Sequence, residues 1–364
     1  MKWSWKLMDV AGIGIYIHAT FLLIVLWVAF GEWSRGGSMG AVLGATLFLL
    51  ALFGCVVLHE LGHALTARRY GIATRDITLL PIGGVARLER MPEDPRQELM
   101  VALAGPAVNV VIAGLLMAVL IAAGRTNPLD EVDLTNGSFV GRLMGINLGL
   151  AIFNLLPAFP MDGGRVLRAL LATRMEYTRA TRAAAIVGQG FAFLLGFVGL
   201  LGNPVLLFIA LFVWMGAEQE SNMVQVRSAL GGIPLARAMI TDFRTLAMGD
   251  TLQQAVDLIL TGSQQDFPVV NGEAVAGVLT RADLLRALAE RGPGAPVSEV
   301  MRRGVQVVES SEMLETAFRR LQGCDCRVIP VVSRGRLVGL VTPENMGEFL
   351  MIQSAMDRAG RLRI

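Results

Sequence analysis

Two histidines and a glutamate stand at positions 59, 60 and 63, in the order His-Glu-x-x-His. On a helix, residues four apart lie on the same face, so the imidazoles of His59 and His63 can bind one Zn²⁺ ion. Glu60 lies beside them and could act as general base on a metal-bound water. Two of the chain's 3 histidines fall within this pattern. The spacing therefore predicts a hydrolytic metal site.

A catalytic zinc usually has three protein ligands and one open position, so a third ligand is needed. Asp162 is the candidate. It follows Asn154–Pro160, in which prolines interrupt helical geometry, and it precedes Gly163 and Gly164, which allow close approach of the backbone. The alternative is that Asp162 is only a charge at a helix end. His18, the remaining histidine, is expected to pack in the interior or line a cavity.

The segments around these residues are expected to cross a membrane. Hydrophobic residues make up 54% of the 364 residues and charged residues 17%, below the roughly 25% charged residues of soluble domains. A span needs about 20 apolar residues. Five uncharged runs have about this length or more, and Gly202-Asn203-Pro204 divides the last one, which predicts six transmembrane helices. The runs are 10–31, 36–58, 99–124, 143–161 and 183–217.

Lysine and arginine gather before the first predicted span, after the second and after the fourth. Such clusters stay in the cytosol, so both termini and the C-terminal domain are expected to be cytosolic. The chain is then a multi-pass integral protein of a bacterial or archaeal-type cell membrane. Basic and acidic residues nearly balance, 32 against 30, so no nucleic-acid partner is expected.

The His59–His63 pattern together with residues 154–163 resembles the site-2 protease family of intramembrane zinc metalloproteases. The family motif Asn-x-x-Pro-x-x-x-[Leu/Met]-Asp-Gly is met from Asn154 to Gly163. The resemblance implies that His59, His63 and Asp162 bind one Zn²⁺ and that Glu60 is the catalytic base. It also implies that Asn154 orients the substrate or stabilises the tetrahedral intermediate, since an amide donor suits a developing oxyanion. Helix–helix hydrogen bonding is the alternative for Asn154.

Two further segments are similar to parts of that family. Residues 77–87 are too short to span and carry strand-like residues around Gly83-Gly84. They resemble a membrane-dipping β-hairpin, whose open edge could pair with an unwound substrate; a simple surface loop is the alternative. Leu103–Asn109 also resembles a family segment, and it is interpreted as a packing site of small residues with no catalytic role.

The C-terminal part contains an internal repeat, in which residues 268–270 match 330–332 and 275–280 match 337–342. The order helix–strand–strand–helix predicts a duplicated α/β module. This part resembles a tandem CBS-domain pair. The resemblance implies that Thr280 contacts the phosphate and Asp283 the ribose of an adenine nucleotide such as ATP or AMP. The second copy has Asn345 in place of the aspartate, which weakens the case for a second ligand. A dimerisation role without ligand is the alternative.

The sequence thus predicts a polytopic α-helical membrane protein with six transmembrane helices and a C-terminal soluble α/β CBS pair. The expected assembly is a homodimer or higher homo-oligomer. The expected divisions are a protease domain, a linker, two CBS domains and a tail, at residues 1–222, 223–235, 236–291, 292–351 and 352–364.

The predicted function is that of an intramembrane zinc endopeptidase. It would cut transmembrane segments of membrane-tethered regulatory proteins near the cytosolic face and respond to adenine nucleotide. Three alternatives stay open: a CBS-gated transporter or channel, a non-catalytic relative that binds membrane proteins, and a metalloprotease of soluble peptides.

Overall fold

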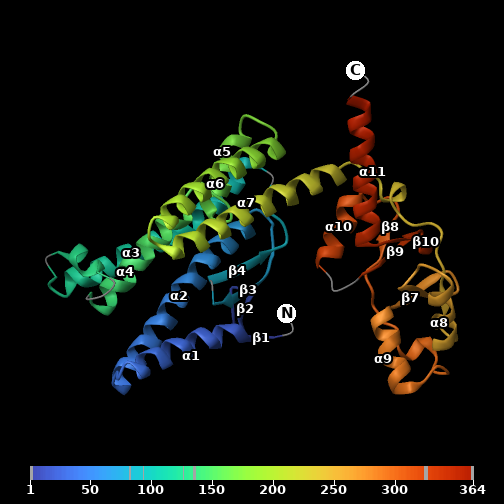
Figure 1. Ribbon diagram of the computed structural model, residues 1–364, viewed down its shortest axis with the longest axis horizontal. Helices are drawn as coiled ribbons and strands as arrows, with labels where there is room; N and C mark the ends of the chain where they lie inside the picture. The colour runs from blue at the N-terminus through green and yellow to red at the C-terminus, as the bar shows by residue number, and fades with distance from the viewer. Residues whose placement is uncertain are drawn as a thin grey trace. The chain divides into compact units, whose positions relative to one another are not determined.

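The computed structural model describes residues 3–361 except 82, 93, 126, 134–136 and 324–326. The chain divides into two compact units, Met1–Val224 and Gln225–Ile364, which are coloured from blue to yellow and from yellow to red in Figure 1. Each unit has its own buried apolar clusters. The first unit carries the predicted metal site, and the second carries the internal repeat.

Long helices dominate the first unit (Figure 1). The helix that carries His59 and His63 begins at an N-cap serine, Ser38, whose hydroxyl accepts a hydrogen bond from the Ala41 amide. The helix that follows the hairpin begins at Asp94, which accepts hydrogen bonds from two amides of the first turn. The helices are α1 (Ala19–Ser34), α2 (Met39–Arg69), α3 (Pro95–Ala122), η1 (Pro128–Val132), α4 (Phe139–Asn154), α5 (Asp162–Ala172), α6 (Tyr177–Leu200) and α7 (Pro204–Leu230).

A four-stranded sheet lies against α2 and has the order β1-β2-β3-β4. The two hairpins are antiparallel, and β2 pairs with β3 in parallel. Its inner side chains, among them Ile13 and Ile77, pack against Leu61 and Ala64 of α2. The fourth strand is an edge strand next to the metal site. The strands are β1 (Ser4–Val10), β2 (Ile13–His18), β3 (Thr74–Leu80) and β4 (Gly83–Leu88). The predicted hairpin at 77–87 is therefore confirmed.

Three described helices are long and apolar enough to cross a membrane: α2, α3 and α6. The first predicted span, 10–31, is wrong over residues 10–18, because Val10 ends β1 and residues 13–18 form β2. Alternating isoleucines at 13, 15 and 17 suit a strand that pairs on both sides with β1 and β3. The remaining helix α1 has 16 residues, as has α4, and spans about 24 Å against a hydrocarbon core of about 30 Å.

The second unit consists of two similar halves, each with the expected order helix–strand–strand–helix. Each half also has a two-residue strand that pairs in parallel with the first strand of the hairpin. A strand of two residues is too short to be recognised in the sequence. The first half contains β5 (Leu246–Ala247), α8 (Leu252–Thr261), β6 (Phe267–Asn271), β7 (Ala274–Leu279) and α9 (Arg281–Arg291). The second contains β8 (Val308–Glu309), α10 (Leu314–Gly323), β9 (Ile329–Ser333), β10 (Arg336–Val341) and α11 (Pro343–Arg361).

Single helical turns precede the two halves, η2 (Leu235–Arg237) and η3 (Val297–Glu299). Residues 223–230, the first part of the expected linker, continue α7 as regular helix.

Candidate active site

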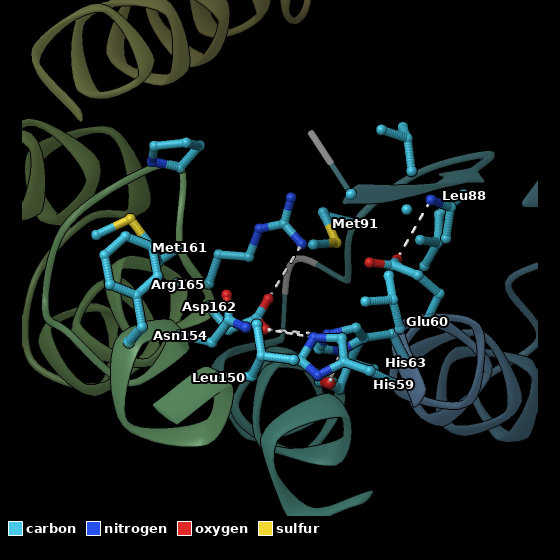
Figure 2. Close-up of a pocket in the computed structure, with 18 of the residues that line it drawn as sticks. His59, Glu60, His63, Leu88, Met91, Leu150, Asn154, Met161, Asp162 and Arg165 are labelled. Carbon is cyan, nitrogen blue, oxygen red and sulfur yellow. Dashed lines mark hydrogen bonds and ion pairs between the residues drawn. The ribbon is translucent and has the colours of Figure 1, made fainter. Parts of the chain in front are cut away.

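Three side-chain atoms from two helices converge in the first unit (Figure 2). The Nε2 atoms of His59 and His63 lie 3.1 Å apart. Oδ2 of Asp162 lies 3.2 Å from the first and 3.1 Å from the second. All three side chains are buried. The structure therefore brings together the two histidines of α2 and an aspartate about one hundred residues further along the chain.

The hydrogen bonds on the far side of each imidazole fix which nitrogen carries the proton. Nδ1 of His63 lies 2.7 Å from the carbonyl oxygen of Val101, which can only accept, so Nδ1 carries the hydrogen. The proton of His59 is assigned through two buried asparagines. The amide nitrogen of Asn147 donates to the carbonyl of Leu143, and that of Asn109 donates to the oxygen of Asn147.

The oxygen of Asn109 then faces Nδ1 of His59 at 2.5 Å and accepts its hydrogen. When both imidazoles are neutral, their Nε2 atoms therefore present lone pairs, and so does the Asp162 carboxylate. Three lone pairs at 3.1–3.2 Å repel one another unless a cation, either a metal ion or a proton on one imidazole, lies among them. The donor set also fits zinc, because tetrahedral ligands at zinc–nitrogen distances of about 2.05 Å lie about 3.3 Å apart.

The backbone between α4 and α5 delivers Asp162 to the histidines. Helix α4 ends at Asn154, and residues 155–161 form a turn before α5 begins at Asp162; Ala158, Phe159 and Met161 of this turn are buried. A side chain at Gly163 would collide with the carbonyl oxygens of Leu155 and Leu156. The chain can fold back this tightly only because glycine occupies that position.

Helix α3 approaches the two imidazoles so closely that a side chain at Gly105 would collide with them. A Cβ atom at Gly105 would collide with Nε2 of His63 and would lie 2.6 Å from Nε2 of His59. The segment Leu103–Asn109 is thus more than a packing site. It supplies the bare backbone beside the imidazoles and, through Asn109, the acceptor that orients His59.

Glu60 lies between the histidines and the edge of the sheet. Its Oε2 accepts a hydrogen bond of 3.3 Å from the amide of Ala86 in β4. A Cβ atom at Gly84 would come within 2.9 Å of the Glu60 side chain. The outer edge of β4 is therefore directed at the catalytic candidate, and the two histidines present their nitrogens nearby (Figure 2).

A cavity of about 460 Å³ connects these groups. Asn154, at the end of α4, lines it, as the resemblance implies for a residue near the substrate. Arg165 also lines it and lies 3.8 Å from the second oxygen of Asp162, so the cavity holds a cation that the sequence reasoning did not single out. His18 is the N-cap of α1 and accepts from the Thr20 amide; it is not among the residues that line the cavity.

The sequence reasoning also missed Asn109 and Asn147, which are both fully buried. One feature could have revealed Asn147: it precedes Asn154 by seven residues, so both lie on one face of an apolar helix. A buried polar side chain in a membrane helix is a reason to look for a functional partner.

In the second unit, Thr280 and Asp283 lie at the start of α9 and contact each other at 2.6 Å. Arg302 donates to the same carboxylate at 2.6 Å. Partial burial would raise the pKa of Asp283, but the hydrogen bonds from Arg302 and Thr280 outweigh it and hold that pKa below its usual value. A separate cavity of about 310 Å³ lies beside Thr342, Asp242 and Asp266 of the same unit.

Comparison with known proteins identifies both parts of the chain. Residues 47–197 match the model of peptidase family M50, and residues 235–290 and 297–350 each match a CBS domain. The chain is 33% identical to the zinc metalloprotease MJ0392 of Methanocaldococcus jannaschii over 94% of both chains. The chain belongs to peptidase family M50. It is a metalloendopeptidase with a C-terminal CBS pair, and the expected resemblance to site-2 proteases is confirmed.

Other known proteins are similar to this M50 peptidase over part of its length. Stage IV sporulation protein FB of Bacillus subtilis is 29% identical over 53% of the chain and 66% of its own length. A solved site-2 protease of Methanocaldococcus jannaschii is 40% identical, covers 60% of the chain and 95% of its own, and has a TM-score of 0.44. Family membership and the long apolar helices make this M50 peptidase an integral membrane protein.

The close approach of α3 predicts that Gly105→Ala abolishes metal binding. The added methyl group would occupy the space between the two Nε2 atoms. Gly114→Ala is the matched control, because a Cβ there, on the same helix, meets nothing within 4 Å. Zinc content of the purified, folded proteins by mass spectrometry measures the effect. Equal zinc in both variants would contradict the geometry.

The hydrogen-bond chain predicts that Asn109→Ala weakens zinc binding by about 10–100-fold, the usual effect of removing a group that orients a metal-binding histidine. Competition with a chromogenic chelator measures the affinity. Asn222→Ala, at an exposed position on α7, should bind zinc like the unsubstituted protein. A comparable loss in both would show that the effect is not specific to His59.

Proposed function

We propose that this M50 peptidase binds one Zn²⁺ at His59, His63 and Asp162 and hydrolyses peptide bonds inside transmembrane segments of other proteins. The observation that carries the proposal is the convergence of three buried lone-pair donors in a unit built from long apolar helices. Ionisable groups at such a depth are costly unless they serve a metal or a polar cavity. The three donors could hold a metal ion, and a cavity lies beside them.

The bound Zn²⁺ would polarise the scissile carbonyl and lower the pKa of an attacking water to about 7. The carboxylate of Glu60 takes the proton of that water and returns it to the leaving amine. The Ala86 amide holds the carboxylate at the cavity. Asn154 donates its amide to the substrate carbonyl or to the tetrahedral intermediate, because its side chain lines the same cavity.

The outer edge of β4 is the proposed binding site for the substrate backbone. A helical substrate hides its peptide bonds within the helix and must become extended before hydrolysis. An extended segment can add to an open sheet edge through main-chain hydrogen bonds. The edge of β4 lies against Glu60, and its Gly83–Ala86 segment lines the cavity. Strand addition there would carry the scissile bond to the histidines.

The membrane arrangement completes the proposal. Six spans would be α1, α2, α3, α4, α6 and α7, with the two 16-residue helices crossing a thinner part of the bilayer or ending below its surface. The positive residues that follow α2 and α4 support a metal site near the cytosolic face and a CBS pair in the cytosol. The proposed substrates are membrane-tethered regulatory proteins, and the proposed assembly is a homodimer or higher homo-oligomer.

Adenine nucleotide at the CBS pair would modulate the protease. Thr280 and Asp283 are the proposed contacts, and Arg302 must release the Asp283 carboxylate when ribose hydroxyls take its place. Arg302 then lies beside the bound nucleotide, where a phosphate could become its new partner. Dimerisation without ligand stays the alternative for this unit.

Glu60→Gln is expected to abolish cleavage of a tethered substrate, because glutamine cannot take up a proton, while zinc content stays at one per chain. The reconstituted protein with a helix-spanning substrate in vesicles provides the assay. Glu32→Gln, at the end of α1, is the control with the same change of charge. Cleavage by the Glu60 variant at the normal rate would exclude Glu60 as the base.

For the CBS pair, Asp283→Ala is expected to weaken AMP binding to the full-length protein at least tenfold in calorimetry, because the ribose loses its acceptor. Asp257→Ala, at an exposed position on α8, should bind AMP normally. No binding of AMP or ATP by the unsubstituted protein would contradict the sensor role. Loss of binding only in Asp242→Ala would place the nucleotide in the second cavity instead.

A further inference from the structure

A buried arginine outside the catalytic cavity ties three helices together. Arg168, two turns along α5 from Asp162, is fully buried. Its Nε donates to Oε1 of Glu98 in α3 at 2.7 Å. Its Nη1 donates to Oε1 of Glu220 in α7 at 2.5 Å. The guanidinium also lies 5.1 Å from the ring centre of Phe159 and 5.0 Å from that of Tyr177. The catalytic chemistry proposed above uses none of these groups.

Each partner of Arg168 belongs to an element that serves the metal site. Glu98 lies three residues before Val101, whose carbonyl orients His63, and on the helix that carries Gly105. Phe159 lies in the turn that delivers Asp162. The Arg168–Glu98 pair therefore fixes the helix that carries the third ligand against the helix that orients the first two.

Helix α7 holds the same turn from the other side. Val213, Gly216, Ala217 and Glu220 follow one another at helical spacing and form one stripe, here called the α7 stripe. Val213 packs with Ala158 and Met161, and Ala217 packs with Phe159. A Cβ atom at Gly216 would lie 2.5 Å from Cδ of Pro160.

The α7 stripe thus covers the residues immediately before Asp162 and binds, through Glu220, the helix immediately after it. We propose that the α7 stripe is the positioning element for the third zinc ligand. The inference deepens the proposed function, since it concerns how the same metal site is assembled and regulated.

The charges of the cluster show which group can be adjusted. Two carboxylates share one guanidinium, and Oε2 of Glu98 is buried without a hydrogen-bond partner. The Glu98 side chain is 1% exposed, whereas that of Glu220 is 31% exposed. Removal of Arg168 would leave two unneutralised carboxylates and endanger folding. Removal of the Glu220 charge leaves the Arg168–Glu98 pair intact, so Glu220 is the position at which the contact between α7 and α5 can be weakened.

The other end of α7 belongs to the second unit. Leu230 is fully buried among Leu235, Val308 and Leu314, and Nε of Arg227 lies 2.6 Å from the Glu315 carboxylate. One uninterrupted helix therefore contains both the residues that hold the Asp162 turn and residues of the CBS core. A rotation or shift of α7 would displace the residues that pack against the turn before Asp162.

The test uses Glu220→Gln and Gly216→Ala, with matched controls Glu218→Gln, at an exposed position on the same helix, and Gly190→Ala, where a Cβ meets nothing within 4 Å. Zinc affinity of the purified full-length proteins is measured by chelator competition with Zn²⁺ alone. Both test variants should bind zinc about tenfold or more weakly, and the controls should not. At limiting zinc kcat should fall while KM is unchanged, and excess Zn²⁺ should restore kcat.

Zinc affinities within twofold of the unsubstituted protein in both test variants would overturn the inference. So would a loss of kcat that excess Zn²⁺ does not restore, since that pattern indicates general damage to the structure. The zinc measurement needs no substrate. An unsubstituted protein that binds zinc but cleaves no helix-spanning substrate would refute the proposed function and leave this test valid.

Discussion

The site depends on one electrostatic constraint: the lone pairs of two neutral imidazoles and one carboxylate meet at about van der Waals distance. Backbone and amide acceptors at the far side of each imidazole bind the Nδ1 hydrogens, so each neutral ring turns its unprotonated Nε2 toward the other groups. A buried carboxylate is then directed at two unprotonated nitrogens. Without a cation the arrangement is repulsive in a medium of low dielectric constant. Much of the first unit can be understood as the framework that holds it.

The residues of the site come from elements of different kinds, a regular helix and an irregular turn. The two histidines need only helical spacing, so α2 supplies them without help. Asp162 comes from a non-helical turn, and such backbone is tolerated at membrane depth only where protein or a polar cavity surrounds it. The turn 155–161 meets this condition, since Ala158 and Phe159 are buried between α6 and α7. This irregular turn therefore requires more packing around it than the helices of the site do.

The sequence alone predicted those residues and domains that a local motif or an internal repeat reveals. His59, Glu60 and His63 follow from one motif, and the CBS repeat follows from its internal match. Residues 10–18 were misjudged, because an uncharged isoleucine-rich segment suits a buried strand as well as a span, and only the distant partner β3 decides between them. Asn109, Asn147 and Arg168 were missed for a related reason. Their roles depend on partners 38 to 70 residues away, which no local pattern contains.

The two sides of the cavity differ in a way that bears on substrate choice. On the metal side Nδ1 of each imidazole is hydrogen-bonded, and the backbone of Gly105 lies directly beside the two rings. On the opposite side β4 offers main-chain groups at an open edge, and one of them already binds Glu60. A rigid metal side can tolerate little variation in the position of the scissile bond. An open strand edge accepts any side chains but requires extended backbone. For the proposed transmembrane substrates, selection would therefore depend on how easily the segment unwinds, and residues that weaken a helix, such as glycine and proline, would matter more than the side chains beside the cleaved bond.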